Sequence, residues 1–128
     1  MMRKEVGLWI DHREALIATA SRDEQDVTRV DSGIDKHTRF VGGASRITEE
    51  DIRDRRFANL LHRYYGDVIA CIRDADSILI LGPGEAKTEL KTMLESQHLG
   101  GRIVGVEAAD KLTDKQVIAR VREHFLVT

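Results

Sequence analysis

The sequence has 128 residues, of which 41% are hydrophobic and 33% are charged, and its formal net charge is −2. This length suits one hydrophobic core, so we expect residues 1–128 to form a single domain. The charge balance excludes a uniformly basic chain but leaves room for a local basic surface. The single cysteine excludes a disulfide framework, and no apolar stretch is long enough to span a membrane. We therefore expect a cytoplasmic protein with no membrane contact.

The first third of the chain predicts three strands followed by a long loop. Val6–Asp11 is apolar at most positions, as in a central strand that is covered on both faces. Ala15–Ser21 follows a short polar break, which predicts a hairpin. Gln25–Asp31 alternates weakly and carries charges, which is typical of an edge strand. The segment from Ser32 to Ile47 contains three glycines and has no regular period, so we expect a loop there.

The remaining two thirds alternate between helices and strands. Apolar residues recur at helical spacing from Phe57 to Ile72, and a hydroxyl followed by acids is typical of a helix start. The predicted elements are a helix from Thr48 to about Arg73, a strand at Ser77–Leu81, a helix from Glu85, a strand at Arg102–Val106 and a helix that opens on the capping box Thr113–Gln116.

The element order is therefore βββαβαβα. Right-handed crossovers in the second half place its strands parallel to one another, beside the hairpin. This order predicts an α/β, ribonuclease H-like three-layer fold with a mixed five-stranded sheet and helices packed on it. A generic α/β sandwich with another strand order is the alternative.

Side chains for metal or nucleophilic chemistry are sparse. A two-metal nuclease needs several converging acids, and although Asp11 is a candidate, the strand Ser77–Leu81 contains no acid. We interpret Asp11 as a turn residue and rank a metal-dependent nuclease last. The histidines lack the spacing of metal ligands, and Cys71 is expected to be a small buried side chain on the long helix. We therefore expect no catalytic residue, no bound metal and no cofactor.

The segment Gly82-Pro83-Gly84 lies where a strand ends and a helix begins. A phosphate-binding loop needs glycine directly before its lysine, but Ala86 precedes Lys87. We interpret Gly82, Pro83 and Gly84 as a structural turn that lets the helix pack on the strand.

Positive charge gathers in the long loop and in the helix that follows it. Lys36, Arg39 and Arg46 occur with no acid between them, and such side chains bind phosphates with little sequence specificity. The alternative is that the arginines of the helix pair with the acids of its first turn. The predicted RNA-binding residues are Lys36, His37, Arg39, Gly42, Gly43, Arg46, Arg53 and Arg56.

Two segments resemble a known family. DADSILILGPGEAKTELKTMLE (Asp74–Glu95) resembles a strand–GPG–helix segment in the central domain of archaeo-eukaryotic peptide-chain release factors and their relative pelota. The hairpin Val6–Ala20 resembles the opening hairpin of that domain. The resemblance is nearest to small bacterial single-domain relatives, and it implies a ribonuclease H-like fold. We expect no counterpart of the stop-codon-reading and C-terminal domains of full release factors within these 128 residues.

The resemblance also bears on function. In release factors the loop before the long helix carries a Gly-Gly-Gln motif that helps water attack the peptidyl ester. Here Gly42 and Gly43 match, but Ala44 stands at the glutamine position, and a methyl group makes no hydrogen bond. Pelota rescues ribosomes without hydrolysis.

We therefore expect a non-catalytic, translation-associated binding protein. The loop Lys36–Arg46 would contact ribosomal or transfer RNA, or a translation partner. A homodimeric protein-interaction module with no nucleic-acid role, paired through Gln25–Asp31, is the alternative.

Overall fold

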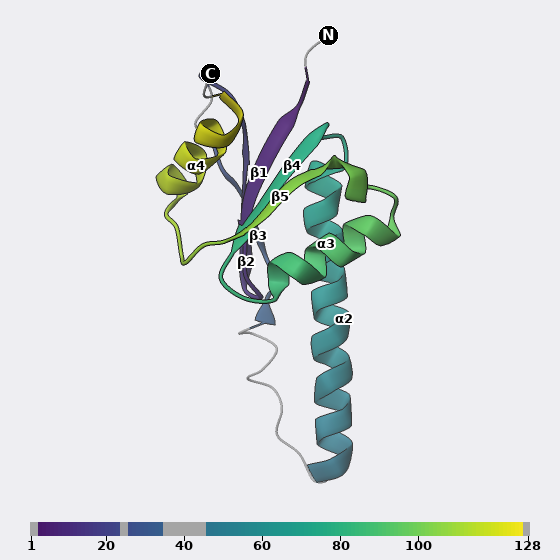
Figure 1. The fold of residues 1–128 in the computed structure, drawn as a ribbon. Coiled ribbons are helices and arrows are strands. Elements are labelled where there is room, and N and C mark those ends of the chain that lie inside the picture. The colour runs from purple at the N-terminus through teal and green to yellow at the C-terminus, as the bar shows by residue number, and fades with distance from the viewer. Residues whose placement is uncertain (1–2, 24–25, 35–45, 127–128) are drawn as a thin grey trace.

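The computed structural model of the protein describes residues 3–23, 26–34 and 46–126. The predicted order of three strands followed by alternating helices and strands is confirmed (Figure 1). The elements are β1 (Glu5–Ile10), β2 (Glu14–Thr19), β3 (Thr28–Asp31), α2 (Arg46–Ile72), β4 (Ser77–Gly82), α3 (Ala86–Ser96), a short 3₁₀ helix η1 (Gly100–Arg102), β5 (Ile103–Ala108) and α4 (Asp114–Leu126).

The five strands form one mixed sheet in the order β3-β2-β1-β4-β5. β1 lies in the centre, antiparallel to β2 and parallel to β4, and Leu8 stands opposite Ile17 on one side and Ile80 on the other. β3 pairs antiparallel with β2, and β5 pairs parallel with β4. The predicted α/β, ribonuclease H-like fold is therefore confirmed. The third strand begins at Thr28, later than the expected Gln25.

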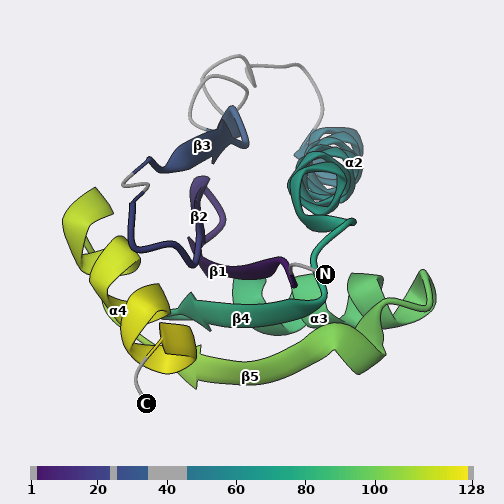
Figure 2. The ribbon, with the colours of Figure 1, turned by 90° about the horizontal axis from the view of Figure 1, so that it is seen from above.

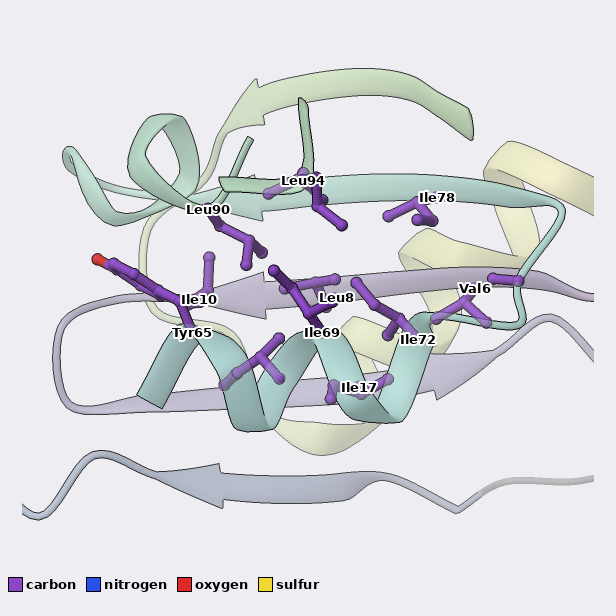
Figure 3. Close-up of a cluster of buried hydrophobic side chains, with 14 of the residues drawn as sticks. Val6, Leu8, Ile10, Ile17, Tyr65, Ile69, Ile72, Ile78, Leu90 and Leu94 are labelled. Carbon is purple, nitrogen blue, oxygen red and sulfur yellow. The ribbon is translucent and has the colours of Figure 1, made fainter. Parts of the chain in front are cut away.

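Helices cover both faces of the sheet, as the apolar pattern of β1 requires. Figure 2 shows α2 and α3 on one side and α4 on the other. Successive residues of β1 point to opposite faces, so Leu8 packs with Ile69 of α2 and Leu90 of α3, and Trp9 packs with Val117 of α4. Figure 3 shows the larger of the two buried clusters, between the sheet and the pair α2 and α3. The result is the three-layer arrangement expected from the sequence.

Two glycines allow close approaches that any other residue would obstruct. A Cβ atom on Gly7 would lie 2.3 Å from Cγ2 of Val121, so α4 packs almost directly on the backbone of β1. A Cβ atom on Gly82 would lie 2.3 Å from the carbonyl oxygen of Ile10. The ends of β1 and β4 are therefore held together more closely than a side chain would permit.

The first half of α2 extends well beyond the sheet (Figure 1). Ile52 and Phe57 there are 41% and 39% exposed, although the apolar spacing of the sequence placed Phe57 on the inner face. The expectation that Cys71 is buried is also wrong, because this thiol lies on the exposed side of the helix. Helical spacing predicts which residues share a face, but not whether another element covers that face.

None of the described helices combines the length and the apolar character that crossing a membrane requires.

Candidate nucleic-acid interface

The candidate site lies at the end of the sheet from which α2 projects (Figure 1). The β1–β2 turn is at this end, and Oδ1 of Asp11 accepts hydrogen bonds from the backbone N–H groups of Arg13 (2.8 Å) and Glu14 (2.9 Å). Asp11 is therefore a turn residue, as its position in the sequence indicated. Among the described residues, no group of three or more His, Cys, Asp or Glu side chains is placed to hold a metal ion.

Two buried tyrosines anchor α2 to this end of the sheet. The hydroxyl of Tyr64 donates a hydrogen bond to the backbone oxygen of Asp11 (2.9 Å), and the hydroxyl of Tyr65 donates to Oε1 of Glu89 on α3 (2.5 Å). Burial raises the pKa of both tyrosines, so both remain neutral donors at physiological pH. Nε2 of His12 lies 2.9 Å from the same oxygen of Glu89. These bonds fix the helix at the point where it leaves the sheet.

Beyond the anchor, α2 presents cationic side chains to solvent. Between Ile52 and Arg63 the sequence has four arginines and a single acid, Asp54. Arg55, Arg56 and Arg63 are exposed, and no ion pair joins them to any residue whose side chain the structure describes. Since exposed guanidinium groups are good phosphate ligands, this part of the helix has the chemistry of a nucleic-acid-binding surface.

The surface is hollowed where α2 passes the end of β3. An inner hollow of about 490 Å³ and an outer hollow of about 420 Å³ share Leu60 and Arg63 in their walls. We call the two together the β3–α2 groove. Its described lining consists of Asp31, Ser32, Gly33, Arg56, Asn59, Leu60, Arg63, Tyr64 and Asp67.

The predicted RNA-binding residues are distributed unevenly over the described chain. Lys36, His37, Arg39, Gly42 and Gly43 lie outside the described residues. Arg46 is the first residue of α2 and Arg53 is in its second turn, but their side chains lie outside the description, as do those of the first-turn acids. Arg56 lines the outer hollow.

Sequence reasoning did not select Asn59 or Arg63 for this surface. Asn59, Leu60 and Arg63 lie three, four and seven residues after Arg56, so helical spacing was the signal that places them on one face.

The segment interpreted as a structural turn connects β4 to α3. Gly82 is the last residue of β4, and Pro83 and Gly84 are exposed in the connection. The ammonium group of Lys87 donates a hydrogen bond to the carbonyl oxygen of Gly84. Glu85 occupies the cap position of α3, where its negative charge disfavours a bound anion.

The predicted edge strand β3 is tied to its own sheet by charges. The guanidinium of Arg29 donates to the carboxylate of Glu14 on β2 and to Oδ1 of Asp114 on α4 (3.2 Å). The ammonium of Lys111 also donates to Glu14, and together these cations hold the pKa of Glu14 below its usual range. The same ammonium lies 4.4 Å from the ring centre of Trp9.

Comparison with solved structures gives two Pelota proteins from archaea. The Pelota protein of Thermoplasma acidophilum matches 92% of this chain with a TM-score of 0.57 and 17% identity, and Pelota of Archaeoglobus fulgidus matches 98% with a TM-score of 0.57 and 15% identity. The chain has a Pelota-like fold. The resemblance to pelota expected from Asp74–Glu95 and the opening hairpin is confirmed at the level of fold.

The likeness covers only part of the Pelota proteins. This chain spans 31% and 32% of the lengths of the two Pelota chains, about a third of each. No protein-family model and no curated protein matches the sequence.

Proposed function

We propose that the chain is a translation-associated binding protein that contacts ribosomal or transfer RNA through the segment Lys36–Arg46 and the part of α2 that precedes Tyr64. The observation that carries this proposal is the set of exposed guanidinium groups at Arg55, Arg56 and Arg63, which have no ion pair with any side chain that the structure describes. The Pelota-like fold supports it, because the family that the sequence resembles works in translation.

The proposed mechanism is binding without hydrolysis. Ala44 stands where release factors carry their glutamine, so the loop has no side chain there to orient a water molecule. Affinity would come from arginine and lysine on phosphates, which makes it strongly dependent on salt. The helix is anchored by Tyr64 and Tyr65, so its arginines are presented on a rigid support rather than on a flexible arm.

Cosedimentation with bacterial ribosomes at graded salt tests the proposal. The variant Arg56→Ala/Arg63→Ala removes two exposed cations from the projecting helix, and Lys91→Ala/Lys115→Ala removes two exposed cations from α3 and α4 as the matched control. Each lost phosphate contact lowers the slope of log affinity against log salt by roughly 0.7 to 0.9.

We expect the arginine pair to lower the slope by about 1.5 and the lysine pair to leave it unchanged. A second variant, with Lys36, Arg39 and Arg46 all changed to alanine, should lower it further. No ribosome or RNA binding at low salt, or equal effects of the arginine and lysine pairs, would reject the proposal. A dimer in light scattering whose formation protects the arginines would favour the homodimeric alternative.

A further inference from the structure

The two ends of the β3–α2 groove carry opposite charges. Arg56 and Asn59 line the outer hollow, whereas Asp31 and Asp67 line the inner one, and Arg63 belongs to both. At about 1.5 Å of rise per helical residue, Arg63 and Asp67 are about 6 Å apart along the axis of α2. A ligand that matches the groove must therefore carry an anionic group and, a short distance away, hydrogen-bond donors.

The charged groups of the groove are available to such a ligand. Arg63 and Asp67 stand four residues apart on the helix, which is a common spacing for ion pairs. Nevertheless, neither is in an ion pair with any residue that the structure describes. Asp67 is exposed, and Asp31 uses Oδ1 to accept the N–H of Gly33 at 2.7 Å.

The wall formed by the end of β3 is held in shape by local hydrogen bonds. The N–H of Ser32 donates to the carbonyl oxygen of Arg13 (2.8 Å), and the N–H of Ile34 donates to the Ser32 hydroxyl (3.3 Å). Gly33 has a φ of 75°, a conformation that favours glycine. The inner hollow, about 490 Å³, has the size of a small-molecule site.

We propose that the groove binds one guanosine nucleotide of a single-stranded RNA. The phosphates lie on Arg56 and Arg63, and the base points inward along Leu60 toward Asp67. Guanine is the base that offers two adjacent donors, N1–H and the N2 amino group, to the two oxygens of a carboxylate. Uracil offers a single N–H that is flanked by two carbonyl oxygens, and these oxygens are repelled by a carboxylate. The groove therefore discriminates between guanine and uracil.

This inference rests on the proposed function, since the nucleotide belongs to the same RNA. An RNA is favoured over a peptide because two arginines, Arg56 and Arg63, line the outer hollow of the groove. A phosphodiester chain places an anion beside every base, which matches the two arginines, Arg56 and Arg63, that precede the carboxylate of Asp67 along the helix.

Fluorescence anisotropy with two labelled RNA nonamers tests the inference. One is all uridine and the other has a single central guanosine. Wild type is compared with Asp67→Asn, which alters the inner hollow, and with Asp54→Asn, an exposed acid of the same helix that does not line the groove. Far-ultraviolet circular dichroism confirms that each variant is folded.

We expect wild type and Asp54→Asn to bind the guanosine nonamer about tenfold more tightly than the uridine nonamer, and Asp67→Asn to bind both equally. Equal affinities in wild type, or a preference that survives in Asp67→Asn, would overturn the inference. If ribosome binding persists with no base preference, only this inference fails and a protein segment becomes the better occupant of the groove. If neither RNA nor ribosomes bind, the proposed function fails as well.

Discussion

Alanine substitutions at Gly82 and Gly84 provide a direct test of how the candidate site is held together. The two glycines flank the same proline, yet their surroundings differ. A Cβ atom at position 82 would lie 2.3 Å from the backbone oxygen of Ile10, whereas one at position 84 would have no atom within 4 Å. Cβ atoms essentially never approach another atom within 3.0 Å, so β1 and β4 must separate by at least 0.7 Å in the Gly82→Ala variant.

The free-energy cost of separating β1 from β4 depends on which atoms have to move. Overpacking a core typically costs about 1 to 3 kcal/mol, and the upper end applies here because the neighbour is backbone in the central strand rather than a flexible side chain. We expect Gly82→Ala to lower the free energy of unfolding by about 3 kcal/mol. Gly84→Ala should change it little, or raise it by up to about 1 kcal/mol, because alanine restricts the unfolded chain.

Urea unfolding measures the difference. With a slope of about 2 kcal/mol per molar urea, a loss of 3 kcal/mol lowers the midpoint by about 1.5 M. The slope itself should stay the same in both variants, which shows that stability rather than compactness has changed. A Gly82→Ala midpoint within about 0.3 M of wild type, or equal losses in the two variants, would refute the packing argument.

Three further predictions test other contacts of the fold. Gly7→Ala should lower the free energy of unfolding by about 1 to 3 kcal/mol in urea titrations. Adding Val121→Ala should recover part of that loss, because it removes the atom that would lie 2.3 Å from the new Cβ. Losses of the two substitutions that simply add would contradict this explanation. Tyr65→Phe should cost about 2 kcal/mol in the same assay, since its hydroxyl donates to the carboxylate of Glu89, and an unchanged midpoint would show that the bond contributes nothing. The pKa of Glu14 is lower in the folded state than in the unfolded state, so the ionised carboxylate stabilises the fold at pH values above its unfolded pKa. This stabilisation is lost as the pH falls through the pKa of Glu14 in the folded state. Glu14→Gln should therefore be less stable than wild type at pH 7 and should approach it at pH 3, whereas a constant difference would exclude this linkage.

Patterns that depend on neighbours in the sequence could be read without a structure. The capping box at Thr113 forms as predicted: its N–H donates to Oε1 of Gln116 (2.8 Å), and its hydroxyl accepts from the N–H of Gln116 (3.2 Å). The apolar run Val6–Asp11 predicted a strand covered on both faces, and β1 is the centre of the sheet. Asp11 was interpreted as a turn residue because it ends this run, beside the polar break, and its hydrogen bonds confirm it.

The candidate site depends on residues that are far apart in the chain. The groove joins the end of β3 to α2, and the anchor of α2 brings together His12 of the β1–β2 turn, Tyr65 of α2 and Glu89 of α3. Sequence spacing contains no information about such encounters, because they are set by how far each helix extends along the sheet and at which residue it crosses.

By itself, the sequence determined the order of the elements, the buried centre of the sheet and the resemblance to pelota. Local propensity and the spacing of apolar residues act within a few positions, so they can be read directly along the chain. Only the tertiary structure decided that Phe57 and Cys71 are exposed, because the face of a helix becomes buried only where another element covers it. The same reason leaves the side chains that the structure describes between Ile52 and Asn59 exposed to solvent.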